Sequence, residues 1–208
     1  MNKESVKLAA KIYGRTAFSG VLCFFIYLSL SVIATATAGK TPEGEVKTVS
    51  AGVLLAVNIV ALLFQGLLFC SMVYATMWTR GDKDNNAVRF KRMQEDKLKG
   101  LKIGLVAAIP SILSYVLLIA EKCFHFYPGY AALYRLLQMA FYPIVIWAFG
   151  SNVTLTTAQI SWGGIALAGV PILILPIVAA VAYWFGYSEI SLSERLVYGK
   201  KGDPQKRQ

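Results

Sequence analysis

Residues 17–38 read AFSGVLCFFIYLSLSVIATATA, and this stretch decides the class of fold. It holds 22 residues without a charge. At about 1.5 Å per residue, a helix of this length matches a hydrocarbon core roughly 30 Å thick. Its small-residue end is typical of a signal-peptidase site, but the basic region and apolar core are longer than in usual signal peptides. We therefore expect a retained membrane helix.

Four more apolar runs follow, at residues 51–78, 101–120, 130–150 and 163–187. Charged residues make up 15% of the chain, whereas soluble domains carry about 25%. No polar stretch is long enough to enclose a separate soluble core. We expect an all-α integral membrane protein, residues 1–208 forming one polytopic domain with a bundle of five hydrophobic helices. Pro171 and Pro176 predict a kink in the last helix.

The net charge of +10 comes from basic residues that lie beside the apolar runs. Residues 80–102 form a basic cytoplasmic loop and residues 188–208 a basic C-terminal tail. Such segments are typical of chains that contact anionic lipid headgroups. No recognised nucleic-acid module accompanies them, so we expect no nucleic-acid partner. Within the basic loop, residues 81–86 predict irregular backbone and Ala87 begins a helix that runs into the third apolar run.

Two membrane topologies fit the pattern. If all five runs cross and the N-terminus is cytoplasmic, the basic tail lies outside. If residues 130–150 instead re-enter or lie at the interface, four spans remain and the tail comes inside. The second topology leaves few basic residues outside, which the positive-inside rule favours, but residues 130–150 are apolar enough to span. Both stay open, and we expect a plasma membrane location. In the four-span case the outer basic residues are Lys40, Lys47, Lys122 and Arg135.

Four polar residues lie within the apolar runs: Asn58, Gln65, Arg135 and Gln138. Polar groups at membrane depth are costly, which makes these residues functional candidates. Asn58 and Gln65 share one helix face, and can line a polar path or bond to a neighbouring helix. For Arg135 two interpretations stay open. It is an interfacial anchor, or it has a functional role as a contact to an anion or substrate or as the partner of Glu121 in an ion pair.

Gly100, Gly104 and Ala108 recur every four residues and form a small-residue ridge. Such ridges let another helix approach closely. We interpret this one as a helix-packing surface, with an interface in an oligomer as the alternative.

Few residues suit catalysis or metal binding. The three cysteines, Cys23, Cys70 and Cys123, have no disulfide or zinc spacing. His125 is the single histidine, and with Cys123 it supplies only two ligands, too few for a closed metal site. No nucleophile has a placed base, and no phosphate or dinucleotide motif occurs. We therefore expect no cofactor, no metal and no enzyme.

The sequence favours a non-catalytic multi-pass protein that acts as an accessory or assembly subunit through helix packing. Its partners would be the lipid bilayer with its anionic headgroups, and another membrane protein or further copies of the chain. The alternative is a small-solute transporter or channel formed by oligomerisation, with the four polar residues lining its pathway.

Overall fold

The computed structural model describes residues 3–38, 49–150 and 156–190. Every regular element in these ranges is helical, and none of them is a strand. Three long helices and the pair α6–α7 are long and apolar enough to cross a membrane. The basic tail lies almost entirely outside the described residues. The helices of 18 residues or more are α1 (Lys3–Thr37), α2 (Ala51–Arg89), α3 (Lys99–Phe124) and α7 (Val170–Tyr187). The short ones are α4 (Tyr130–Leu137), η1 (Met139–Phe141), α5 (Tyr142–Phe149), η2 (Thr157–Gln159) and α6 (Trp162–Ala168).

Helix α2 continues well beyond its apolar run, so the prediction of a loop at residues 81–86 is wrong. The helix ends at Arg89, and the irregular connection to α3 covers residues 90–98 instead. The reason is the packing of α7 against this polar stretch. A Cβ on Gly81 would lie 2.2 Å from the Tyr183 carbonyl oxygen, and one on Gly186 2.0 Å from the Trp78 carbonyl oxygen. Two glycines thus let the backbones of α2 and α7 touch.

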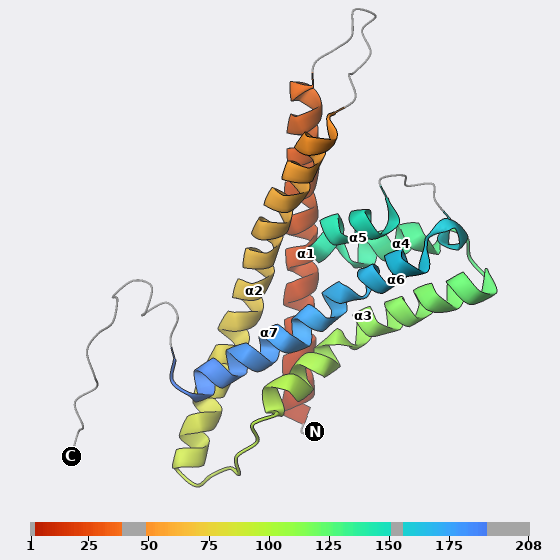
Figure 1. Ribbon diagram of the computed structural model, residues 1–208. Helices are drawn as coiled ribbons and strands as arrows, with labels where there is room; N and C mark the ends of the chain where they lie inside the picture. Colours follow the sequence, from red (N-terminus) through yellow and green to blue (C-terminus); the bar gives the residue numbers. More distant parts are fainter. Residues whose placement is uncertain (1–2, 39–48, 151–155, 191–208) are drawn as a thin grey trace, which may run out of the picture.

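Helices α3 and α7 lie side by side and antiparallel, and they run obliquely to α1 and α2 (Figure 1). The small-residue ridge lies in their contact. A Cβ on Gly100 would meet the Tyr183 ring, and one on Gly104 would lie 2.8 Å from both Pro176 Cα and Ala179 Cβ. Ala108 is fully buried. The ridge therefore packs within the chain, against α7.

The fifth apolar run contains a break as well as a proline inside its second helix. Helix α6 ends at Ala168 and α7 starts at Val170, with Gly169 between them. Pro171 stands in the first turn of α7, where the missing N–H costs nothing. Pro176 lies inside α7.

The fourth apolar run is a bent pair rather than one helix. Helices α4 and α5 join through η1 and turn by 79°. The 3-10 turn η1 contacts α1, while α4 packs on α3 and α5 on α6 (Figure 1). The tyrosine hydroxyls of α4 anchor it: Tyr130 donates to the Ser114 carbonyl at 3.0 Å and Tyr134 to the Ala168 carbonyl at 2.7 Å.

The bent pair leaves one end of the bundle and returns to the same end. Lys122, near the end of α3, donates to the carbonyl oxygens of Ala158 at 2.6 Å and Ile160 at 2.7 Å, just before α6. Because α6–α7 starts where α3 stops, the chain between them reverses direction. The N-terminal end of α1, the end of α2, the start of α3 and the end of α7 gather at the opposite end.

The outer hairpin is defined as residues 28–37 of α1 and 51–67 of α2, and its tip extends past the other helices (Figure 1). Within it, burial is confined to a seam where the two helices meet. Large apolar side chains face outward all around this seam, with Val32 66% exposed and Leu67 70% exposed. The buried residues of the outer hairpin are Ala34, Asn58, Ala61 and Gln65.

Candidate functional site

The two polar residues of α2 lie on the seam of the outer hairpin. Gln65 is fully buried, and its Nε2 donates to the Cys23 carbonyl oxygen of α1 at 3.2 Å. Asn58 is 8% exposed, and its Oδ1 has no hydrogen-bond partner among the described residues. Gln65 thus links two helices, as polar groups in membrane helices commonly do.

Arg135 lies inside the bent pair. It is 3% exposed, and its guanidinium donates to the Gly150 carbonyl oxygen at 3.1 Å and sits 5.8 Å from the centre of the Phe149 ring. These contacts of Arg135 connect α4 to the end of α5. Neither a surface anchor nor an ion pair with Glu121 describes this position. The carboxylate of Glu121, itself buried, accepts from the Tyr127 N–H at 2.8 Å and fixes the turn after α3.

Gln138 occupies the bend between α4 and η1. Its backbone N–H donates to the Tyr134 carbonyl oxygen, and its own carbonyl accepts from Phe141, both at 3.0 Å. These two hydrogen bonds fix the backbone of Gln138 in the bend. The side chain is 6% exposed, and its amide nitrogen is buried with no hydrogen-bond partner among the described residues.

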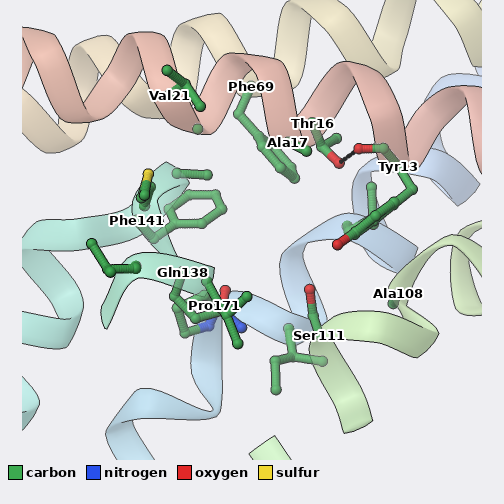
Figure 2. Close-up of a pocket in the computed structure, with 17 residues that line it drawn as sticks. Tyr13, Thr16, Ala17, Val21, Phe69, Ala108, Ser111, Gln138, Phe141 and Pro171 are labelled. Carbon is green, nitrogen blue, oxygen red and sulfur yellow. Dashed lines mark hydrogen bonds between the residues drawn. The ribbon is translucent and has the colours of Figure 1, made fainter. Parts of the chain in front are cut away.

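A cavity of about 220 Å³ lies where this bend meets the rest of the bundle. Its walls come from α1, α3, α7 and the α4–η1 turn, with Phe69 of α2. Figure 2 shows the side chains of Tyr13, Ser111 and Gln138 directed toward the same space from three different elements. The rest of the wall is mainly apolar. An apolar cavity with a few convergent polar groups is the usual form of a small-molecule site.

The mouth of the cavity opens on an apolar surface. Val21 of α1 and Leu136 and Leu137 of α4 belong to the cavity wall and are 43%, 48% and 52% exposed. None of the described residues that line the cavity carries a charge. A molecule entering there would cross an apolar rim and meet uncharged hydrogen-bonding groups inside.

The structure does not bring the four polar candidates together. Gln138 lines the cavity, and Arg135 lies one turn away on α4 without joining its wall. Asn58 and Gln65 belong to the seam between α1 and α2, and neither lines the cavity. The candidates therefore occupy two separate places in this chain.

A charged cluster at the opposite end was missed by sequence reasoning. Asp84 of α2, 3% exposed, accepts from Lys99 of α3 at 2.7 Å, from Arg80 at 3.2 Å and from the Tyr183 hydroxyl of α7 at 3.0 Å. It joins three helices. The spacing of Arg80 and Asp84, four residues apart, was the available signal, but it matters only if the segment is helical.

Next to this cluster, an exposed ion pair joins the connection between α2 and α3 to the first turn of α3. Lys102 Nζ lies 2.9 Å from the Asp96 carboxylate, and this hydrogen bond is the main reason that the pKa of Asp96 is lowered. The Leu98 N–H donates to the same carboxylate at 3.2 Å.

Cys123 and His125 have positions that suit the end of a helix. Both are exposed, and His125 takes a left-handed backbone conformation (φ 52°) as it terminates α3. Among the described residues no group of three or more His, Cys, Asp or Glu side chains could hold a metal ion.

Comparison with known proteins returned no relative. No family model matches the chain. No curated protein and no solved structure matches it either.

Proposed function

We propose that the chain is a multi-pass protein of the plasma membrane with four spans, a re-entrant segment and a cytoplasmic N-terminus. Four apolar helices of sufficient length support the spans. The return of α4–η1–α5 to the end from which it leaves supports re-entry. The basic residues of α1, the end of α2 and the start of α3 gather at one end, which suits a cytoplasmic face.

Within that membrane, the protein works as a non-catalytic accessory subunit whose outer hairpin packs against a helix of another membrane protein. The observation that carries this proposal is Gly66. It lies on α2 in a strongly apolar stretch, yet a Cβ built on it would meet nothing within 4 Å. Packing within the chain does not require a glycine there, and a glycine in a helix costs about 1 kcal/mol relative to alanine. A close approach by a partner helix explains its use.

The neighbouring surface fits such a partner. Leu63 and Leu67, which lie next to Gly66 on α2, are 63% and 70% exposed. A partner helix would rest on the glycine and pack against these two leucines. A solute pathway formed by oligomerisation gains less support, since the polar candidates lie in two separate places.

The test is retention of a stoichiometric partner after purification in mild detergent. Gly66→Leu should release the partner without unfolding the protein, because the added side chain meets open space in the chain itself. Gly14→Leu is the matched control: this glycine of α1 also has nothing within 4 Å but lies outside the outer hairpin. Purification of a chain without any partner, or equal retention by both variants, would refute the proposal.

Topology is tested separately with a thiol reagent that cannot cross membranes. In a variant whose native cysteines Cys23, Cys70 and Cys123 are changed to serine, a cysteine introduced at Lys201 should stay unlabelled in intact cells and react after lysis. Labelling in intact cells would contradict four spans with a cytoplasmic N-terminus. Flux assays in reconstituted vesicles test the competing pathway: transport above empty vesicles that Gln138→Leu abolishes would favour a transporter.

A further inference from the structure

We propose that the cavity at the bend of α4–η1 is a binding site for a neutral lipid, which places its ester or hydroxyl head beside Gln138 and its chain in the apolar mouth. This site is independent of the partner-binding role given to the outer hairpin. Four features of the cavity identify this class of ligand: an unpartnered amide, the absence of charge, the volume and the position of the mouth.

The amide of Gln138 is the anchor. Its nitrogen lies buried beside the Tyr134 hydroxyl but makes no hydrogen bond of ordinary geometry with it or with any other described residue. A buried donor in this position is unfavourable. A ligand that carries a carbonyl oxygen would satisfy it. The backbone of Gln138 is fixed by its two hydrogen bonds in the bend, so the side chain starts from a defined place. The hydroxyls of Tyr13 and Ser111, directed toward the same space, suit the further oxygen atoms of a glycerol head (Figure 2).

The absence of charge selects a neutral head. No described residue of the wall is acidic or basic, so a phosphate or a carboxylate would be buried without a counter-charge. The basic residues that suit anionic lipids lie instead at the ends of α1, α2 and α3. A neutral ester needs only hydrogen bonds, which this wall offers.

The volume and the mouth select a lipid over a compact solute. A cavity of about 150 Å³ holds benzene, so 220 Å³ holds a small head and a short piece of chain but not a whole lipid. The remaining chain must leave the cavity. It can do so between Val21 of α1 and Leu136 and Leu137 of α4, which are exposed apolar residues of the rim. In the bilayer this exit faces lipid.

The experiment uses the full-length protein in nanodiscs and a monoacylglycerol probe with a diazirine near its ester and an alkyne at the end of its chain. After irradiation, mass spectrometry should find adducts on peptides that contain residues 13–21 and 136–141. Excess unlabelled monoacylglycerol should suppress them, and a fatty acid of the same chain length should not. Equal competition by the fatty acid would overturn the assignment of a neutral head.

Two variants should prevent the lipid from entering the cavity. Ser111→Phe fills the cavity, and Ala17→Trp blocks its rim from an exposed position of α1 where the fold tolerates a large side chain. Each should lower the adduct yield at least tenfold. Ser29→Phe, the same change as the first but at an exposed position of α1 outside the cavity, should leave the yield unchanged. Labelling of both cavity variants at the wild-type level would overturn the proposal.

Gln138→Leu tests the anchor, since leucine has nearly the shape of glutamine without its hydrogen bonds. It should weaken competition by monoacylglycerol about tenfold. Gln65→Leu is the matched control, a buried glutamine outside the cavity, and should bind like the wild type. Unchanged binding in Gln138→Leu, or adducts spread evenly along residues 28–37, would contradict the site.

Discussion

The contact between α2 and α7 gives the sharpest prediction, which concerns Gly186→Ala. The new Cβ would lie 2.0 Å from the Trp78 carbonyl oxygen, whereas ordinary contact begins near 3.4 Å, so the helices must separate locally by about 1.4 Å. A backbone oxygen cannot rotate away as a side chain can. Overpacking of a tight contact costs about 1–3 kcal/mol and occasionally more. We expect the upper part of this range, about 3 kcal/mol, or more than a hundredfold in the unfolding equilibrium.

The assay is unfolding in mixed micelles as the fraction of denaturing detergent rises, followed by circular dichroism. Gly66→Ala is the matched control, because its Cβ meets nothing within 4 Å and alanine favours the helix by about 1 kcal/mol. The first variant should lose stability and the second should gain a little. If the two variants unfold at the same point, or if Gly186→Ala loses less than about 1 kcal/mol, the close contact of α2 and α7 is refuted.

Three further predictions concern charged residues. Asp84→Ala should cost about 3 kcal/mol in the same assay, because it leaves the partly buried Lys99 without its partner, whereas Asp82→Ala should change little; equal effects would contradict the cluster. Lys102→Met should raise the pKa of Asp96 toward its ordinary value in an NMR titration, and an unchanged pKa would refute the pairing. The pKa of Asp96 is lowered in the folded state, so the ionised carboxylate stabilises the fold at neutral pH. This stabilisation is lost as the pH falls through the pKa that Asp96 has in the folded protein. Arg135→Met should cost about 2 kcal/mol locally, seen as faster hydrogen exchange in residues 142–149, and exchange at the wild-type rate would contradict the Gly150 contact.

The apolar runs predicted helices because length and hydrophobicity are local properties. All five runs are helical in the described structure, although the fourth is bent and the fifth is broken at Gly169. The positions of the prolines do not predict where the fourth run bends. The 79° turn comes at Gln138, while Pro143 lies inside the first turn of α5, where a helix accepts proline. The bend arises from contacts of α4 with α3 and of η1 with α1, which a local pattern does not contain.

The candidate site was only partly predictable for the same reason. Gln138 stood out as a polar residue in an apolar run, and it does line the cavity. Tyr13 and Ser111 did not stand out, since a tyrosine near a membrane interface and a serine in a membrane helix are common. Asp84 falls in the polar stretch 81–86, for which the sequence predicts a loop. Its partners come from α3 and α7, the latter 99 residues away along the chain, so no local pattern could reveal the burial.

The position of α7 has a consequence for assembly during synthesis. This helix follows all the other described helices in the chain, yet it supplies the most extensive contact of α2 and the partner of the α3 ridge. Until it emerges from the ribosome, the backbone groove at Gly81 and the carboxylate of Asp84 have no cover from it. Until then α2 and α3 lack the helix that packs against both of them. Chains released before α7 would therefore leave this face of α2 uncovered and Asp84 without its Tyr183 partner.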